Sequence, residues 1–546
     1  MSRLNVLSDE KFLTTFFRNL ARQQNIPVTL HYKGRKYTSR MLFEDKAGRQ
    51  PMLQLTPEAK ASVNGTPVKV AFLDRELFFL LETNLRPGDN GLHHMVKPFV
   101  IYSSFRRTLP RYRLNEGEPG TVSFLTQGTF PLIDISTEGF SFLSDRKLWT
   151  RKEAVHNITV NLDDGMEIIV DGRVRFYRRE KDGSYLYGLK VNVSEWFPRY
   201  DFFRYIARKT YPNVRWMEEC ERDDVLELYE KSGYFSLKPR VEMQRSIDCW
   251  KTTYGKLRNK RQVSANLVYD SNGKLLTAAS ALRIYDKTFL GHQLASLPEA
   301  RLNMKSKTDV YFVMSDFLID HLYCDHYLTY FDTHNPWHRE VYTKMGAFID
   351  DENKFIFDEM EMFEYNAGRR KSLTAQKGYT VEVPDSPAEF LGYCKKNMKP
   401  VERDCYDYDE GSFSLRKITQ VYEVLDLYVV RRLWSVKKKG KIVAYAVAET
   451  YSDGLNLFNL LDMCRVYFAD GEINRKEVLQ ALLPQVEVFF SKYGKERFYV
   501  TLKGNGQDVK SLEFSGFQHR HSAGRVMMSR PGMIEYRTVL AMNSRR

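Results

Sequence analysis

Two arginines four positions apart, Arg107 and Arg111, precede a second cluster formed by Asp134, Ser136 and Gly139. Planar guanidinium groups suit phosphate oxygens, which they bond through paired N–H groups, and they also stack on the flat faces of purines. In the second cluster a carboxylate can accept from the N–H edge of guanine, a hydroxyl can bond a phosphate, and a glycine lets the backbone approach closely. The combination predicts a ligand that carries both phosphate and guanine.

Strand-like segments lie around both clusters. Twenty-two residues separate Arg111 from Asp134, and the intervening segments 121–124 and 131–133 are apolar or alternating. Such patterns are typical of β-strands, and a small barrel would need them here.

Arg-x-x-x-Arg followed by Asp-x-Ser-x-x-Gly resembles the signature of the PilZ domain, which marks bacterial receptors for cyclic di-GMP. Segment 187–193 contains an aromatic residue, a glycine and alternating apolar residues, and it is similar to the closing strand of that family. The alternative interpretation is a solvated basic stretch around Arg111 and a simple turn after Asp134.

The resemblance implies a role for each residue of the two clusters. The arginines clamp phosphates and stack on guanine, with one of them, Arg106, assisting. Asp134 accepts from a guanine edge, Ser136 bonds a phosphate and Gly139 admits the base. The predicted cyclic di-GMP site consists of Arg106, Arg107, Arg111, Asp134, Ser136 and Gly139.

The composition favours several folded domains and anionic partners. A chain of 546 residues is too long for one core, and 43% hydrophobic and 14% aromatic residues are ample for packed interiors. The net charge of +14 points toward a nucleotide, an acidic surface or nucleic acid. Nucleic acid ranks last, because charge alone supports it.

No segment of eighteen apolar residues occurs, so no transmembrane helix is predicted. The first residues lack the apolar core of a signal peptide, and the cytosol is therefore the expected location.

A group of histidine and cysteine residues is a candidate metal site. The six cysteines form no Cys-x-x-Cys pair, which argues against disulfides and thiolate zinc sites. The expected helix end, turn and strand separate the remaining candidates, so no metal site is predicted. These candidates are His321, Cys324, His326, His334 and His338.

The N-terminal half is predicted to hold two β domains. Residues 1–98 begin with a helical pattern at 9–20 and continue with strand-like runs, and a β-barrel ahead of a PilZ domain resembles the architecture of flagellar-brake proteins. The PilZ domain covers 99–205, and a helix at 199–208 leads into the C-terminal part as a conduit for a ligand signal. The strand-like runs are 28–32, 51–55, 68–72 and 76–83.

The C-terminal part contains a duplication. Asn335 and Gly346 recur as Asn505 and Gly516, with a spacing of 11 in both copies and an offset of 170. A strand and, before it, an amphipathic helix precede each copy, which predicts two successive α/β domains. The helices are 310–322 and 476–493, and the strands are 327–331 and 497–502.

This order of elements resembles the second half of the GNAT acyltransferase fold, in which an asparagine and a Tyr-x-x-x-Gly-Phe run close the acyl-CoA cleft. The first copy keeps Tyr342 and Gly346, whereas the second keeps Gly516 and has Leu512 where the tyrosine would stand. Tandem modules of this kind also occur in Fem-type peptidyl transferases.

The resemblance implies acyl-CoA as a donor and Tyr342 as the acid that reprotonates the leaving thiolate. The favoured alternative for Tyr342 is a core tyrosine that packs the helix against the sheet. The Gly-x-Gly loop that would cradle the pyrophosphate is missing at both junctions, 290–309 and 461–471. The alternatives are a divergent acyl donor, an aminoacyl donor, or no catalysis.

The sequence thus predicts a multidomain protein with two N-terminal β-barrel domains followed by two α/β GNAT-like domains. Its predicted function is cyclic di-GMP-dependent signalling, in which the GNAT-like half is the output. That half either docks a protein partner of the motility or envelope machinery without catalysis, or acts as a regulated N-acyltransferase. The predicted boundaries are 1–98, 99–205, 206–372 and 373–546.

Overall fold

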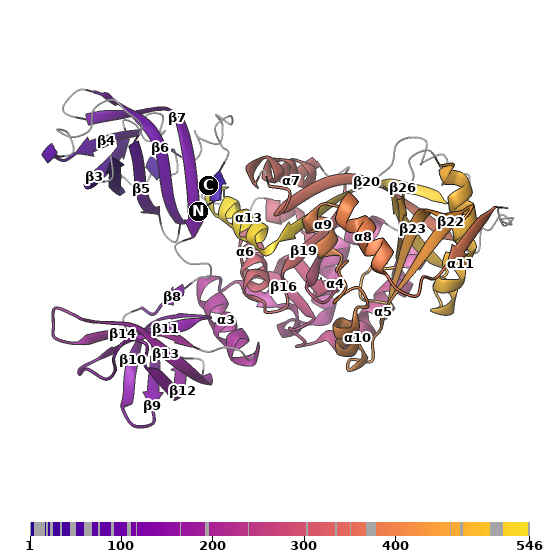
Figure 1. Cartoon of the computed structure of the whole chain (residues 1–546). Coiled ribbons are helices and arrows are strands. Elements are labelled where there is room, and N and C mark those ends of the chain that lie inside the picture. Colours follow the sequence, from indigo (N-terminus) through magenta and orange to yellow (C-terminus); the bar gives the residue numbers. More distant parts are fainter. Residues whose placement is uncertain are drawn as a thin grey trace.

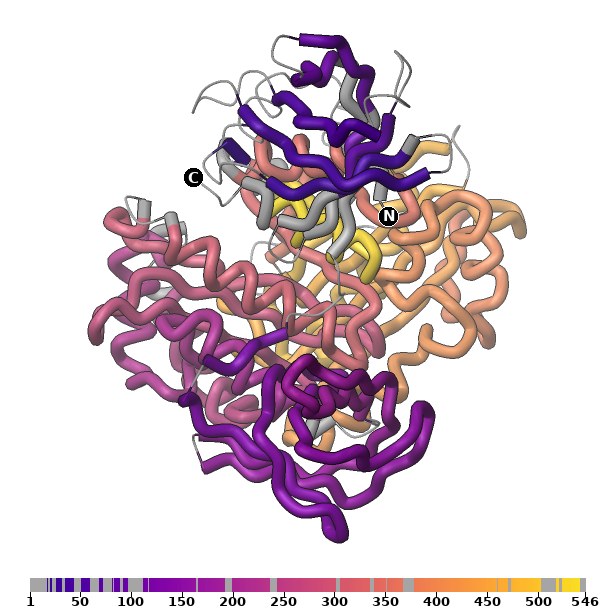
Figure 2. The backbone as a smooth tube through the Cα atoms, turned by 90° about the vertical axis from the view of Figure 1, so that its left-hand side faces the viewer, coloured from indigo at the N-terminus to yellow at the C-terminus, as the bar shows by residue number. Residues whose placement is uncertain are grey.

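A computed structural model shows two β-barrels beside a large α/β body (Figure 1). Both barrels lie on the same side of the body, as a perpendicular view makes clear (Figure 2). The residues that the structure describes are 2–4, 17, 20–21, 26–32, 35–43, 51–58, 68–74, 77–88, 92–105, 111–115, 117–163, 165–191, 196–237, 240–301, 304–333, 336–349, 351–366, 378–458, 460–469, 473–502 and 517–543.

The first barrel is a closed antiparallel ring in the order β7-β4-β3-β2-β5-β6, and β1 adds to it along β7. Its sheet extends past the predicted boundary at residue 98, because β7 ends at Phe105. The strands are β1 (Ser2–Leu4), β2 (Ile26–Tyr32), β3 (Arg35–Phe43), β4 (Pro51–Leu55), β5 (Val68–Asp74), β6 (Leu77–Pro87) and β7 (Leu92–Phe105).

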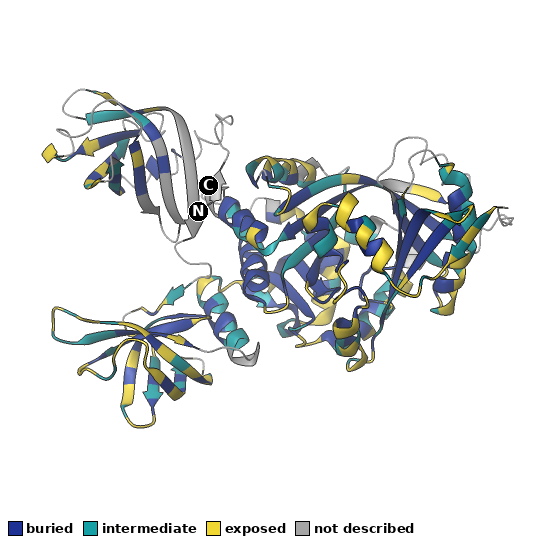
Figure 3. Cartoon of the chain, in the orientation of Figure 1, coloured by how far each residue is buried: buried dark blue, intermediate teal, exposed yellow. Residues whose placement is uncertain are grey.

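The second barrel closes in the order β9-β10-β11-β14-β13-β12, and β8 pairs with the last part of β10. Buried and exposed residues alternate along its strands (Figure 3), as expected for a one-layer barrel around its own core. The strands are β8 (Arg111–Arg113), β9 (Gly120–Phe124), β10 (Gly128–Ser136), β11 (Gly139–Ser144), β12 (Ala154–Leu162), β13 (Glu167–Arg179) and β14 (Tyr185–Val191).

Helix α3 (Trp196–Thr210) follows the second barrel and packs on two partners at once. Phe202, Tyr205 and Ile206 belong to the core of the barrel. Phe203 instead faces the α/β body, where its ring lies 5.7 Å from that of Phe317. The helix predicted at 199–208 is therefore confirmed, and it joins the core of the barrel to the core of the body.

One twelve-stranded sheet runs through the α/β body in the order β15-β16-β17-β18-β19-β26-β20-β25-β24-β23-β22-β21. The strands are β15 (Val214–Trp216), β16 (Ser264–Ser271), β17 (Lys274–Arg283), β18 (Thr288–Ser296), β19 (His326–Asp332), β20 (Phe355–Asn366), β21 (Tyr379–Glu382), β22 (Val429–Lys438), β23 (Lys441–Tyr451), β24 (Met463–Phe468), β25 (Arg497–Leu502) and β26 (Gln518–Ser529).

Helices cover this sheet. They are α4 (Arg222–Lys231), α5 (Arg240–Leu257), α6 (Met304–Asp320), α7 (Pro336–Ile349), α8 (Ala388–Asn397), α9 (Pro400–Cys405), α10 (Arg416–Glu423), α11 (Arg475–Lys492) and α13 (Arg530–Asn543), with 3-10 turns η2 (Met217–Glu219), η3 (Tyr234–Leu237) and η4 (Pro298–Arg301).

The strand order is symmetric about the centre of the sheet, since β15–β19 run inward from one edge and β21–β25 from the other. This symmetry reflects the predicted duplication. In the first half, β18 and β19 form a parallel pair with α6 between them in the chain, and in the second half β24 and β25 do so with α11. The two inner strands are exchanged, because β26 from the end of the chain pairs with β19, while β20 pairs with β25. Each half therefore completes the sheet of the other.

Within the described residues, no helix is long and apolar enough to cross a membrane. The predicted helix 476–493 is observed as α11, whereas Asn335 of the first copy and Asn505, Leu512 and Gly516 of the second lie outside the described residues.

The exchange predicts that the two halves stay together when the chain is cut. A specific protease site inserted between β20 and β21 should give two fragments that elute as one species from a sizing column without denaturant. The reason is that β20 keeps its pairs with β25 and β26 after cleavage. Fragments that separate under native conditions would contradict the exchanged arrangement.

Candidate functional site

The pairing of three short strands brings four of the six predicted ligand-binding residues to one place. Strand β8 pairs with β10 so that Arg111 lies opposite Ser136. The β10–β11 hairpin then places Ser136 opposite Gly139. Asp134 lies two positions before Ser136 and therefore on the same face of β10. The predicted residues Arg106 and Arg107 lie outside the described residues.

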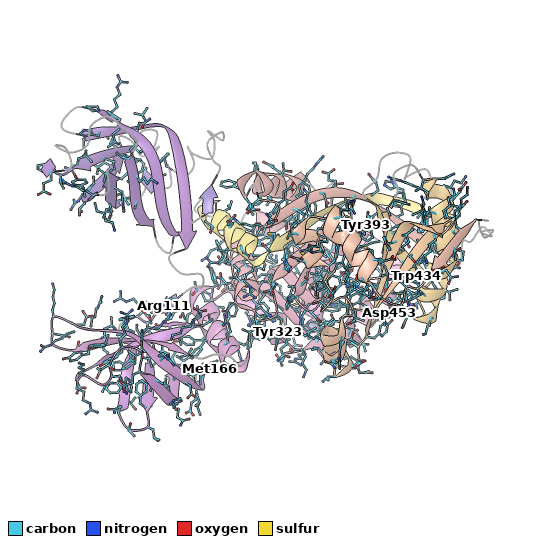
Figure 4. The ribbon with its side chains drawn as sticks, viewed as in Figure 1. Arg111, Met166, Tyr323, Tyr393, Trp434 and Asp453 are labelled. Carbon is cyan, nitrogen blue, oxygen red and sulfur yellow. The ribbon has the colours of Figure 1, made fainter. Side chains whose placement is uncertain are left out.

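Arg111 and Asp134 contact each other directly. The Arg111 Nη1 atom donates to the Asp134 Oδ1 atom at 2.5 Å, and the two side chains keep 18% and 19% of their surface exposed. An ion pair at this depth holds the guanidinium in one orientation while leaving it within reach of solvent. Arg111 lies at the rim of the second barrel nearest the first barrel (Figure 4).

Two local contacts hold the hairpin after Asp134: a hydrogen bond from the Ser136 side chain, and close packing of the Gly139 backbone against β14. The Ser136 hydroxyl donates to the Gly139 carbonyl at 2.9 Å, and both residues are buried. A Cβ atom on Gly139 would clash with the carbonyl oxygen of Leu189 on β14. Glycine is therefore needed here for packing against the neighbouring strand, whether or not a ligand is bound.

Strand β8 is also tied to helix α3. The Tyr112 hydroxyl donates to Glu118 at 2.7 Å, and the Tyr112 ring meets that of Tyr205 edge-on at 6.1 Å. Lys209 of α3 donates to the same Glu118 carboxylate at 2.7 Å. Although burial opposes it, these contacts with Lys209, Asn115 and Tyr112 lower the pKa of Glu118 to about 2. The strand that carries Arg111 thus contacts the helix that leads to the body.

The tip of the same hairpin reaches into the α/β body. Thr137, which is fully buried, donates to the Oδ1 atom of Asp320 at 3.0 Å. Arg199 of α3 donates to the same oxygen through Nε at 2.9 Å and Nη2 at 2.5 Å. Asp320 ends α6, so one carboxylate connects the barrel, the joining helix and the body.

Burial sets the electrostatics of this junction. Asp320 is 3% exposed, and burial raises its pKa from 3.8 to about 6, with Arg199 acting in the opposite direction. The unfolded chain therefore releases this proton at a lower pH than the folded chain does. This group makes folding less favourable as the pH rises from 3.8 to about 6.

The predicted catalytic residue, Tyr342, lies in α7 and is 6% exposed. Its ring packs 5.2 Å from Phe331, and burial raises its pKa well above the ordinary value. Tyr342 also lines a cavity beside the parallel pair β18–β19. It is thus a core tyrosine that also faces an internal space.

The residues of the Asp320 junction were not predicted. Thr137 occupies a variable position inside the Asp-x-Ser-x-x-Gly motif, and nothing in the sequence around Asp320 distinguishes it from other helical aspartates. Among the residues of the junction, only Arg199 lies in a segment that the sequence predicts to connect the barrel with the C-terminal part.

Among the described residues, no group of three or more His, Cys, Asp or Glu side chains could hold a metal ion. His321 instead makes a 3.0 Å hydrogen bond with the carbonyl of Arg261, and Cys324 is buried.

Comparison with known proteins gives structural matches only. No protein-family model matches the chain, and no curated protein matches it. YcgR from Escherichia coli, in a complex with c-di-GMP, is 14% identical over 36% of this chain and 88% of its own, with a TM-score of 0.27. An acetyltransferase of the GNAT family from Colwellia psychrerythraea is 11% identical over 58% and 99%, with a TM-score of 0.28.

A tandem GNAT protein from the clavulanic acid biosynthesis pathway is 10% identical over 49% of this chain and 83% of its own, with a TM-score of 0.29. All three are distant similarities, and each covers only part of the chain.

The contact with Asp320 predicts that removing the Thr137 hydroxyl lowers the stability of the protein. Thr137→Val keeps the shape of the side chain but leaves the Asp320 carboxylate without one buried donor, and it should lower the free energy of unfolding by about 1.5–3 kcal/mol. Thr129→Val, at an exposed position of β10, the strand that leads into this turn, should change it by less than about 0.5 kcal/mol. Equal changes in the free energy of unfolding of the two variants, measured by urea denaturation, would contradict a stabilising hydrogen bond between Thr137 and Asp320.

Proposed function

We propose that the second barrel binds cyclic di-GMP at the rim formed by β8, β10 and β11. The observation that supports this is the convergence of Arg111, Asp134, Ser136 and Gly139, which fold from two separate sequence clusters into one site. A cationic fork, a carboxylate and a hydroxyl then face a ligand that carries phosphates and guanine edges.

In this proposal the ligand replaces contacts that the side chains make with one another. Arg111 turns from Asp134 to a phosphate or to the face of a guanine, and Asp134 then accepts from the N–H edge of that base. Both side chains keep part of their surface exposed, so the ligand can reach them and replace the contact that the ion pair loses. Ser136 turns its hydroxyl from Gly139 to a phosphate oxygen, and Gly139 leaves room for the base. Arg106 and Arg107 complete the clamp.

We further propose four functional units in a protein of the bacterial cytosol. Their bounds are the predicted 1–98, 99–205, 206–372 and 373–546, with the first boundary moved to the end of β7 at Phe105. The barrels receive the signal, and the tandem GNAT-like half is the output. The link between them is the contact of Thr137 with Asp320, since a ligand at Ser136 acts on the adjacent residue of the hairpin. In the favoured form of the proposal the output docks a protein partner of the motility or envelope machinery and carries out no catalysis.

The second candidate function is a cyclic di-GMP-regulated N-acyltransferase that uses acyl-CoA or an aminoacyl donor. The position of Tyr342 on the wall of a cavity favours it, because a tyrosine hydroxyl there can approach a leaving thiolate and donate a proton to it. Transfer of an acyl group to an amine, lost in Tyr342→Phe, would favour this function over a silent output.

The binding proposal is tested by calorimetric titration of cyclic di-GMP into the full chain. Arg111→Ala and Asp134→Ala should each weaken binding by roughly 100-fold or more. The first removes the cation that binds a phosphate of the ligand, and the second removes the acceptor for the N–H edge of guanine. Arg107→Lys should also weaken it, since an ammonium cannot replace a planar stacking fork.

The matched control is Arg113→Ala, which removes an exposed arginine from the same strand. It should retain the affinity of the wild type. Equal loss of affinity in Arg113→Ala and Arg111→Ala would mean that binding depends on overall positive charge and not on a specific site. Unchanged affinity in Arg111→Ala would refute the assignment.

A further inference from the structure

The first half of the α/β body encloses a cavity of about 700 Å³. It opens where the parallel strands separate, since pairing of β18 with β19 ends at Gly291 and Thr329 while both strands continue. Helices α6, α7 and α13 supply part of its wall. A space of this volume lies in the range of small-molecule sites.

The second half of the chain completes the wall. Phe458 and Leu460 come from the segment between β23 and β24, and Tyr499 comes from β25. The Tyr499 hydroxyl donates to the Phe458 carbonyl at 3.3 Å, which holds the two parts of this wall together. The strand exchange thus builds a partly open chamber whose wall neither half supplies alone.

The chamber carries no positive charge among the lining residues that the structure describes, because none of them is lysine or arginine. Asp332 and Glu364 lie in the wall. Burial lowers the pKa of His292 to about 3 and that of His338 to about 4, so both imidazoles are neutral near pH 7. An anion would be desolvated in this chamber without a counter-charge.

Three buried polar atoms in the wall lack a hydrogen-bond partner among the described atoms: Ser280 Oγ, His292 Nδ1 and Gln293 Nε2. Of these, Gln293 Nε2 can act only as a donor; the residue is 3% exposed, and its Oε1 atom accepts from Tyr229 at 3.5 Å. Gln293 lies in an irregular stretch of the β17–β18 pairing and has a φ of 54°, which is rare for a residue other than glycine. Strained backbone and an unmatched donor at one position are typical of a ligand site.

We propose that this chamber is a second ligand site, which binds an uncharged or cationic, largely apolar molecule with a carbonyl group that accepts from Gln293 Nε2. Aromatic and methionine side chains surround the apolar body of this ligand. Glu364 is paired with Arg497 at 3.6 Å, so the preference against an anion comes from the lack of lysine and arginine among the described lining residues. The site is separate from the second barrel and does not rest on cyclic di-GMP binding. It is an alternative to the second candidate function, in which acyl-CoA would reach Tyr342 in the same chamber.

Matched probes that differ in charge test the proposal on the full chain. N-phenethylacetamide is neutral and carries a carbonyl, phenethylamine is cationic, 3-phenylpropionate is anionic, and acetyl-CoA is a polyanion. The amide and the amine should bind saturably in ligand-observed NMR, with a Kd on the order of 1 mM. The two anions should bind at least about tenfold more weakly.

Gln293→Met tests the donor, because it retains an unbranched side chain of similar length and removes only the amide. It should weaken binding of the amide roughly three- to tenfold and leave binding of the amine unchanged. Because the buried Tyr229 hydroxyl loses its acceptor, the melting temperature of the free protein should fall, and the comparison of amide with amine separates this effect from ligand binding. Arg111→Ala should leave all four probes unaffected, which separates this site from the proposed nucleotide site.

Three results would overturn the proposal: an anion that binds as tightly as the amide, no binding by either the amide or the amine, or equal weakening of amide and amine in Gln293→Met. If Gln293→Met does not fold, the charge series on the wild-type chain still decides the question.

Discussion

A single buried carboxylate joins the second barrel, the connecting helix and the α/β body. Asp320 accepts from Thr137 of the second barrel and from Arg199 of the connecting helix, while its own backbone ends α6 of the α/β body. An ionised group at this depth is stable only while its donors stay in place, because each one lost leaves charge unpaired in the interior. The position of the hairpin tip, the rotation of α3 and the end of α6 are therefore mutually dependent.

This dependence connects the two proposed ligand sites. Ser136, beside the Arg111–Asp134 pair, is the immediate neighbour of Thr137. At the other end, Leu318 lines the chamber and lies two positions before Asp320 in α6. A small movement of the hairpin can thus reach the wall of the chamber through one helix turn. Because α3 packs on the barrel with Phe202 and on the body with Phe203, it would move with the same displacement.

The parts of the account that the sequence could predict are those encoded locally. The strand pairing that unites Arg111 with Ser136 follows from a motif and alternating segments, and the repeated order of helix and strand follows from spacing. The exchange of β20 and β26 could not be predicted, because either partner satisfies the same hydrophobic pattern and only long-range packing decides between them. Thr137 and Asp320 are 183 positions apart. The need for Gly139 was predicted, but its packing cause, the Leu189 carbonyl, required the structure.

The central claim is that cyclic di-GMP at the second barrel acts on α6 through Asp320. Hydrogen–deuterium exchange of the peptides covering 304–320, with and without saturating cyclic di-GMP, tests it most directly. The account predicts a ligand-dependent change of exchange in this helix for the wild type, and loss of that change in Thr137→Val although the nucleotide still binds. A nucleotide that binds while exchange in α6 stays unaltered, or a change that persists in Thr137→Val, would contradict it.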